Sequence, residues 1–176
     1  MLILSLNVRG FGGASKMLAL KNLFSSVKPD VVFLQETMVD HLRAKDYFLK
    51  ISPSWNCVAI DSVGNSGGLL SGRNRCIWQF EAFQSVLGIF LEGRVSTLPD
   101  SITFLNCYGP YKESLYFLHL AESSGCLEEA SLIVGGDLNF TLSAREVWGD
   151  RSRLDPLADV LSNLFVAAGL VDVMPR

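Results

Sequence analysis

The chain has 176 residues, of which 49% are apolar and 19% are charged. This composition excludes intrinsic disorder, because so apolar and weakly charged a chain can bury a core, and the length suits one domain. Fifteen Lys and Arg residues against 18 Asp and Glu residues give a formal net charge of −3. A protein that holds nucleic acid through net charge alone is therefore excluded, and any phosphate contact must come from local basic groups or a metal ion.

The sequence contains no segment typical of secretion or membrane insertion. Its first apolar run, residues 1–6, is too short for a signal peptide, and no other run approaches the roughly 18 apolar residues of a membrane span. The four cysteines are widely spaced and form no C-x-x-C pair, which favours buried, reduced thiols over a zinc site or disulfides. We therefore expect a protein of the nucleus or cytoplasm that is neither secreted nor bound to a membrane.

The N-terminal part predicts two buried strands on either side of a helix. An apolar run at residues 2–6 leads into a glycine-rich loop, and a second run at residues 31–34 predicts the next strand. Between them, apolar residues recur at helical spacing behind Ser15, the expected N-cap, and Pro29 ends the helix. This is a β-α-β beginning.

From residue 55 onward, short strand-like runs alternate with turn residues, a pattern typical of antiparallel sheets. The expected strands are 55–60, 69–70, 75–80, 85–91 and 102–108. The expected turns are 61–68, 71–74, 92–93 and 98–100.

The last part of the chain predicts a helix around residues 115–121, a strand at 132–134 and a final helix over 154–168 that ends at Gly169. The sequence shows no repeat and no linker. We therefore predict one α/β domain over residues 1–176, with two packed, mostly antiparallel sheets and helices outside them.

Five polar residues stand at or just beyond the carboxyl ends of predicted buried strands, where a strand fixes a side chain beside a crevice. They are Asn7, Glu36, Tyr108, Asp137 and Asn139. Each also has a purely structural interpretation. Asn7 suits a turn, Glu36 a cap of a helix over residues 37–45, Tyr108 the edge of the core, and Asp137 with Asn139 an Asx turn.

Together these residue types suit the hydrolysis of a phosphate ester. The Glu36 carboxylate and the Asn7 amide are hard oxygen ligands of the kind that Mg²⁺ prefers. Asp137 can orient or deprotonate a water molecule, and the Asn139 amide and the Tyr108 phenol can donate hydrogen bonds to phosphate oxygens as charge develops.

Five segments occur in the order and approximate spacing of a known superfamily. They are Leu-Ser-Leu-Asn-Val-Arg-Gly (4–10), Val-Val-Phe-Leu-Gln-Glu-Thr (31–37), Ser-Gly-Gly-Leu (66–69), Asn-Cys-Tyr-Gly-Pro (106–110) and Gly-Gly-Asp-Leu-Asn (135–139). On these segments the chain resembles the endonuclease/exonuclease/phosphatase superfamily, and within it the apurinic-type endonuclease domain of non-LTR (LINE-type) retrotransposons.

The resemblance implies a four-layered α/β sandwich, dependence on Mg²⁺ or Mn²⁺, and cleavage of a DNA phosphodiester. In the family a reverse transcriptase domain lies on the same polypeptide. By resemblance, Glu36 and Asn7 are the metal ligands, and Tyr108 contacts the scissile phosphate. Asp137 positions or activates the attacking water, and Asn139 supports the transition state.

Three arginines after the last motif, Arg145, Arg151 and Arg153, lie near Trp148 in a region that faces nucleic acid in the family. They suit phosphate contacts, although an ordinary exposed basic loop explains them equally well. The Gly67-Gly68 pair is expected to be structural and to allow close packing at a strand start.

One departure from the family concerns a C-terminal Ser-Asp-His signature, whose histidine contacts the phosphate. No residue after Asp172 supplies it, and His41 and His119 suit solvated or structural roles. We therefore expect the chain to correspond to about the first three quarters of the domain, lacking its last strands, and to cleave DNA weakly or not at all. The alternatives are a non-catalytic remnant or binding module, and a phosphatase branch acting on inositol phosphates or sphingomyelin.

Overall fold

The computed structural model describes residues 1–64, 66–74, 79–94, 100–109, 131–142, 146 and 155–173. The chain divides into two compact units. The first comprises Met1–Tyr108 and Ser131–Asp137, and the second comprises Gly109–Ala130 and Leu138–Arg176. Within the described ranges, none of the helices has both the length and the apolar character needed to cross a membrane.

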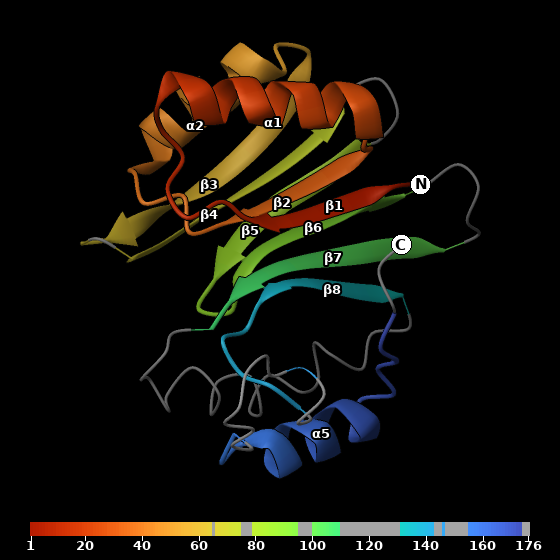
Figure 1. The fold of residues 1–176 in the computed structure, drawn as a ribbon. Helices are drawn as coiled ribbons and strands as arrows, with labels where there is room; N and C mark the ends of the chain where they lie inside the picture. Colours follow the sequence, from red (N-terminus) through yellow and green to blue (C-terminus); the bar gives the residue numbers. More distant parts are fainter. Residues whose placement is uncertain are drawn as a thin grey trace. The chain divides into compact units, whose positions relative to one another are not determined.

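The first unit contains two sheets of four strands each. The first sheet has the order β1-β2-β4-β3 and consists of β1 (Ile3–Asn7), β2 (Val31–Gln35), β4 (Ser66–Asn74) and β3 (Trp55–Val63) (Figure 1). β1 and β2 are parallel, whereas β4 pairs antiparallel with both β2 and β3. The predicted β-α-β beginning thus forms one edge of this sheet.

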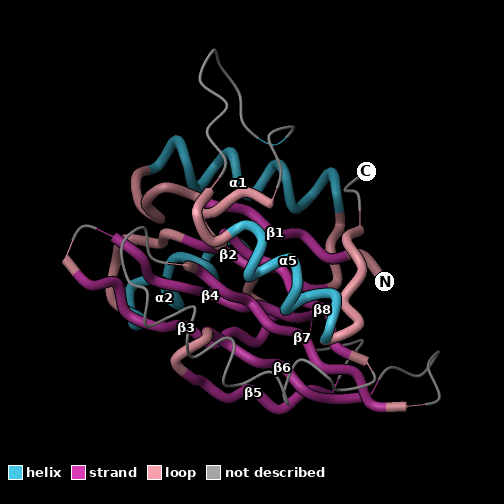
Figure 2. The backbone as a smooth tube through the Cα atoms, turned by 90° about the horizontal axis from the view of Figure 1, so that it is seen from below, coloured by secondary structure: helices cyan, strands magenta, loops and turns pink. Residues whose placement is uncertain are grey.

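The second sheet has the order β5-β6-β7-β8, which Figure 2 shows with the strands side by side. It consists of β5 (Gln79–Ser85), β6 (Gly88–Arg94), β7 (Ser101–Tyr108) and β8 (Leu132–Asp137). The first three strands form an antiparallel meander, and β8 is parallel to β7. Each sheet therefore has one parallel strand pair at an edge.

The sheets pack face to face because each strand turns alternate apolar side chains toward the other sheet. This core is formed by Val31, Phe33, Leu69, Phe80, Ile89, Leu91, Ile102 and Phe104. The other face of the first sheet is covered by α1 (Ala14–Val27) and α2 (His41–Ile51) (Figure 1). The predicted α/β sandwich with two packed sheets is confirmed. The second unit contains α5 (Ala158–Ala167).

Two predicted helix boundaries are wrong in detail. α1 begins at Ala14 after Gly13, so Ser15 lies inside the helix and does not cap it. α2 begins at His41 rather than near Thr37, because the Asp40 side chain accepts a 2.9 Å hydrogen bond from the Arg43 backbone N–H. Glu36 is therefore not a helix cap.

Three other helix predictions have different outcomes. α1 ends at Val27, ahead of Pro29, as predicted. Gly169 follows α5 with a φ of 67°, the conformation expected of a C′ glycine. The helix predicted at residues 115–121 lies outside the described residues.

The turns predicted at residues 71–74 and 92–93 are wrong, since both lie inside strands. Gly72 is glycine because the Phe48 ring occupies the space that a Cβ would need. The single strand predicted at residues 85–91 is interrupted by a turn before Gly88. At Gly88 a φ of 144° and the neighbouring Asn106 carbonyl leave no room for a side chain.

Candidate functional site

The site residues of the first unit lie at the carboxyl ends of its two parallel strand pairs. Asn7 pairs in register with Gln35, the residue before Glu36. Tyr108 pairs in register with Asp137. Because neighbouring parallel strands end at the same edge, each sheet brings two of the predicted residues together.

Asn7 and Asp137 link the two sheets. Asn7 Nδ2 donates a 2.7 Å hydrogen bond to Asp137 Oδ2, although the two residues are 130 positions apart. β8 can approach the first sheet because Gly135 has no side chain; a Cβ there would lie 2.9 Å from the Phe33 ring. The absence of a side chain at Gly135 therefore helps to bring Asp137 close to Asn7.

Glu36 leaves the strand in an unusual backbone conformation. Simple alternation along β2 would turn its side chain toward the helices, as it turns Val32 and Leu34. Glu36 instead has a φ of 53°, a conformation that costs a non-glycine residue roughly 1–3 kcal/mol. Its Oε1 accepts a 3.0 Å hydrogen bond from the Tyr108 hydroxyl of the second sheet. The strained residue thus carries the carboxylate that meets the other sheet.

The loop after Glu36 is fixed by the start of β4. The backbone N–H groups of Thr37 and Met38 donate to the carbonyls of Gly68 and Gly67, each at 3.1 Å. Gly68 has a φ of 81°, and a Cβ there would overlap the Thr37 hydroxyl. The expectation that the Gly67-Gly68 pair allows close packing at a strand start is confirmed.

Glu36 is only 7% exposed. Among the described residues, no lysine, arginine or histidine forms an ion pair with it. A buried carboxylate without a cationic partner is costly in free energy, and a bound cation would remove that cost. The chemistry of the site therefore favours a positive ion beside Glu36.

The donor set suits a magnesium-type ion rather than a zinc-type ion. The part of the chain that the structure describes contains no group of three or more His, Cys, Asp or Glu side chains placed to hold a metal. Mg²⁺ does not need such a cage, because one or two carboxylates suffice when water and substrate phosphate complete its shell. Glu36, Asp137 and the Asn7 amide oxygen supply oxygen atoms of this kind, so the residues present fit such an ion.

Lys16 and an inward-facing amide pair were not predicted as part of this region. Lys16 Nζ donates to the carbonyls of Val8 and Arg9, at 2.9 and 2.8 Å, and so holds the loop that follows Asn7. No feature of the sequence pointed to this contact. Gln35 and Asn106 form a buried hydrogen bond beneath the site, and their polar side chains inside apolar strands were a signal that could have been used.

The other predicted site residues belong to the second unit or are not among the described residues. Asn139 belongs to the second unit, where it has a φ of 53° and its Nδ2 donates to the Gly109 carbonyl at 2.5 Å. Arg145, Arg151 and Arg153, with Trp148, lie outside the described residues, and so does His119.

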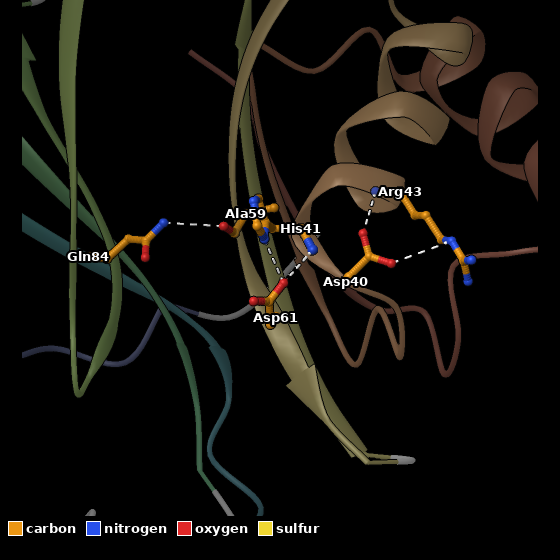
Figure 3. A network of polar contacts seen from close by, with 6 residues as sticks. All are labelled: Asp40, His41, Arg43, Ala59, Asp61 and Gln84. Carbon is orange, nitrogen blue, oxygen red and sulfur yellow. Dashed lines mark hydrogen bonds and ion pairs between the residues drawn. The ribbon is translucent and has the colours of Figure 1, made fainter.

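His41 has a structural role, as expected. Its backbone N–H and its Nδ1–H both donate to Asp61 Oδ1, at 2.6 and 2.7 Å, which ties the start of α2 to β3 (Figure 3). The backbone N–H and the ring together lower the pKa of the Asp61 carboxyl, with the backbone hydrogen bond as the larger cause. In the same view, Gln84 of β5 donates to the Ala59 carbonyl of β3 at 3.2 Å.

Comparison with known proteins gives a family and a fold. The model of the Endonuclease/Exonuclease/phosphatase family matches residues 4–167. None of the curated protein sequences matches the chain.

Solved structures with the same fold include two nucleases and a phosphatase. A 3′-5′ exonuclease (NExo) from Neisseria meningitidis has a TM-score of 0.71 at 16% identity, over 96% of this chain and 71% of that one. An AP endonuclease from Archaeoglobus fulgidus has a TM-score of 0.68 at 18% identity, over 95% of this chain and 70% of that one. A mannosyl-6-phosphatase from Bacteroides thetaiotaomicron has a TM-score of 0.63 at 13% identity, over 96% of this chain and 71% of that one. The chain spans 63% and 64% of the length of two other similar structures, less than two thirds of either.

Proposed function

The chain belongs to the Endonuclease/Exonuclease/phosphatase family, and we propose that it is a retrotransposon-type endonuclease domain that hydrolyses DNA phosphodiesters with the help of a divalent metal ion. The family contains nucleases and phosphatases, and its members generally use divalent metal ions. One observation carries the proposal. Glu36, a buried carboxylate with no cationic partner among the described residues, meets Tyr108 beside the bonded pair of Asn7 and Asp137.

Glu36 would be the main metal ligand, with Asn7 beside it, and the ion would be Mg²⁺ or Mn²⁺. When bound, such an ion polarises a phosphoryl oxygen and offsets the negative charge that develops during hydrolysis. The Asn7 amide, which is bonded to Asp137, would keep the metal ligand and the water-binding carboxylate in register. This role explains why the metal ligand Glu36 comes from the first sheet and the water-binding carboxylate of Asp137 from the second.

The other residues would act on water and phosphate. Hydrolysis joins a water oxygen to phosphorus and breaks the bond between phosphorus and one sugar oxygen. The Asp137 carboxylate would orient the water and accept its proton, and the departing sugar oxygen takes up a proton in turn. The Tyr108 hydroxyl donates its single hydrogen to Glu36 in this structure, and would turn it to the phosphate when the Glu36 carboxylate holds a metal ion. Asn139 would donate to the charge that develops in the transition state.

DNA is the proposed partner because the five segments of the sequence follow the order and spacing of the retrotransposon endonucleases. The neighbours named as an exonuclease and an AP endonuclease share the fold and agree with this proposal. In retroelements a reverse transcriptase domain lies on the same polypeptide. We propose slow cleavage by these 176 residues, because they contain no Ser-Asp-His segment and the loss of one transition-state donor commonly costs about 10²- to 10³-fold in rate.

The proposal can be tested by incubating an excess of the purified chain with supercoiled plasmid, with and without abasic sites, in Mg²⁺. Parallel reactions contain a phosphoinositide or a sugar phosphate. Glu36→Gln and Asp137→Asn serve as inactive controls of nearly unchanged size. We expect slow nicking that needs Mg²⁺ and disappears in both variants.

Three results would contradict the proposal in different ways. Release of inorganic phosphate without nicking would indicate the phosphatase branch. Binding of DNA without any hydrolysis would indicate a non-catalytic binding module. Rapid nicking that survives in Asp137→Asn would show that the assigned residues do not perform the reaction.

A further inference from the structure

Two amide side chains cross the interface between the sheets directly beneath the candidate site. Gln35 is 1% exposed and Asn106 is fully buried. Gln35 Nε2 donates a 2.8 Å hydrogen bond to Asn106 Oδ1. Because Gln35 ends β2 and Asn106 lies in β7, this bond joins the first sheet to the second. We call the pair of side chains the amide bridge.

The amide bridge is also anchored at both ends. Asn106 Nδ2 donates to the Leu70 carbonyl at 3.0 Å and to Ser71 Oγ at 3.1 Å. Gln35 Nε2 also donates to Ser5 Oγ at 3.2 Å. Both amide nitrogens therefore donate both of their hydrogens. This avoids the cost of roughly 1–3 kcal/mol in folding free energy that an unsatisfied buried donor carries. A fully paired buried network of this kind favours one arrangement of the strands over others.

The amide bridge lies between an apolar layer and the site. Below it, the Phe33 and Phe104 rings from the two sheets are 6.4 Å apart between centroids. Such contacts are not directional, so they resist separation of the sheets more than small sliding. Hydrogen bonds are directional. The amide bridge is thus suited to fix how far one sheet is displaced along the other.

This displacement decides where the site residues lie. Glu36 is joined directly to Gln35, and Tyr108 lies two residues beyond Asn106 on the same face of β7. We propose that Gln35 and Asn106 are positioning residues, which set Glu36 relative to Tyr108 and thereby set metal affinity and the rate of hydrolysis. This inference rests on the proposed function and deepens it.

A purely stabilising role makes a different prediction, and a double substitution separates the two. Gln35→Met with Asn106→Leu replaces both amides by apolar groups of similar size, which removes their mutual hydrogen bond and also removes one donor each from the Leu70 carbonyl and Ser71 Oγ. Gln35→Asn with Asn106→Gln keeps both amides and their summed length. The matched control is Phe104→Leu, which loosens the apolar layer below without touching the amides.

The measurements are urea unfolding, calorimetric titration of each full chain with Mg²⁺ alone, and KM and kcat for plasmid nicking. We expect the double apolar variant to bind Mg²⁺ at least about tenfold more weakly, the equivalent of one to two hydrogen bonds. Its kcat should fall more than its KM rises. The exchanged-amide variant should recover most of the affinity, and Phe104→Leu should lose stability without losing affinity.

Equal Mg²⁺ affinity in the parent and a folded double apolar variant would overturn the positioning role and leave the proposed function intact. A parent chain that binds no Mg²⁺ would overturn the proposed function and this inference with it. Where the double apolar variant does not fold, Ser71→Ala decides, because it removes one acceptor of Asn106. A loss of about threefold in affinity supports the inference, and no loss overturns it.

Discussion

The two sheets of the first unit are built alike, but they hold their site residues in different ways. Each has a parallel strand pair whose carboxyl ends carry two of these residues. The loop that follows β1 is hydrogen-bonded to the loop that follows β2, because the Gly10 N–H donates to the Glu36 carbonyl at 2.7 Å. After Tyr108 and after Asp137 the chain passes into the second unit.

According to their proposed roles, we call Asn7, Glu36 and their loops the metal end, and Tyr108 with Asp137 the water end. The metal end is braced within the first unit by backbone hydrogen bonds and by the Gly67-Gly68 pair. A buried carboxylate that is to bind a cation needs such bracing, because its free energy depends strongly on geometry. The difference suggests that the metal end is preorganised for affinity, whereas the water end governs the rate.

The largest effect is expected from breaking the brace of the metal end. In Gly68→Ala the new Cβ would overlap the Thr37 hydroxyl, and the residue has a φ of 81°. Backbone strain of about 1–2 kcal/mol adds to crowding of about 1–3 kcal/mol. Urea denaturation should show this loss, and calorimetry should show at least about tenfold weaker Mg²⁺ binding, or about 1.4 kcal/mol.

Gly64→Ala is the matched control in the same hairpin, since Gly64 has a φ of 63° but nothing lies within 4 Å of a Cβ. Gly64→Ala should lower the free energy of unfolding through backbone strain, but it should leave the Mg²⁺ affinity unchanged. Equal behaviour of the two variants would mean that the contact with Thr37 does not hold Glu36 in place.

The second prediction concerns the water end. In Gly136→Ala the Cβ would overlap the Cys107 carbonyl of the neighbouring strand, which should cost about 1–3 kcal/mol. Because Asp137 follows directly, single-turnover nicking should slow markedly while Mg²⁺ affinity stays close to that of the parent. Loss of affinity as large as in Gly68→Ala would remove the distinction between the two ends.

Tyr108→Phe probes the bond that joins the ends. It removes the 3.0 Å hydrogen bond to Glu36, which is worth about 1.5 kcal/mol for a charged acceptor. We expect a lower unfolding midpoint, slower nicking and Mg²⁺ binding that is weaker by up to about tenfold, because this hydrogen bond helps to hold the Glu36 carboxylate in place. An unchanged unfolding midpoint and an unchanged nicking rate would show that the Tyr108 hydroxyl contributes neither to stability nor to hydrolysis.

The smallest effect is expected at the start of α2, away from both ends. Hydrogen bonds from His41 lower the pKa of Asp61 below its ordinary 3.8. A lowered carboxyl pKa stabilises the fold above the ordinary value, and that stability is lost as the pH falls through the lowered pKa. The stability difference between the parent and Asp61→Asn should therefore be constant well above pH 3.8 and should shrink as the pH falls through that value and below it. A difference that stays constant as the pH falls through that value would contradict the role of the charge.

The meeting of four polar residues was predicted better from the sequence than the strand boundaries were. Asn7, Glu36, Tyr108 and Asp137 were singled out because each stands at or just beyond the carboxyl end of a predicted strand. Gly72 was misread because glycine marks both turns and close approach, and only the position of the Phe48 ring distinguishes the two.

Other features depend on contacts that local patterns do not contain. The positive φ of Glu36 is imposed by backbone bonds to residues far along the chain. The hold of Lys16 on the carbonyls of Val8 and Arg9 likewise requires the packed positions of α1 and β1. The amide bridge was visible only as two polar residues in apolar strands, without any sign that they would meet.

The central claim is that Glu36 is the metal ligand of a site that both sheets complete. Calorimetric titration with Mg²⁺ of the parent, Glu36→Gln and Asn139→Ala tests it most directly. Glu36→Gln removes the charge of a hard-cation ligand, whereas Asn139 is assigned to the transition state. We expect Glu36→Gln to weaken Mg²⁺ binding clearly more than Asn139→Ala does. Equal Mg²⁺ affinity for Glu36→Gln and the parent would contradict the assignment.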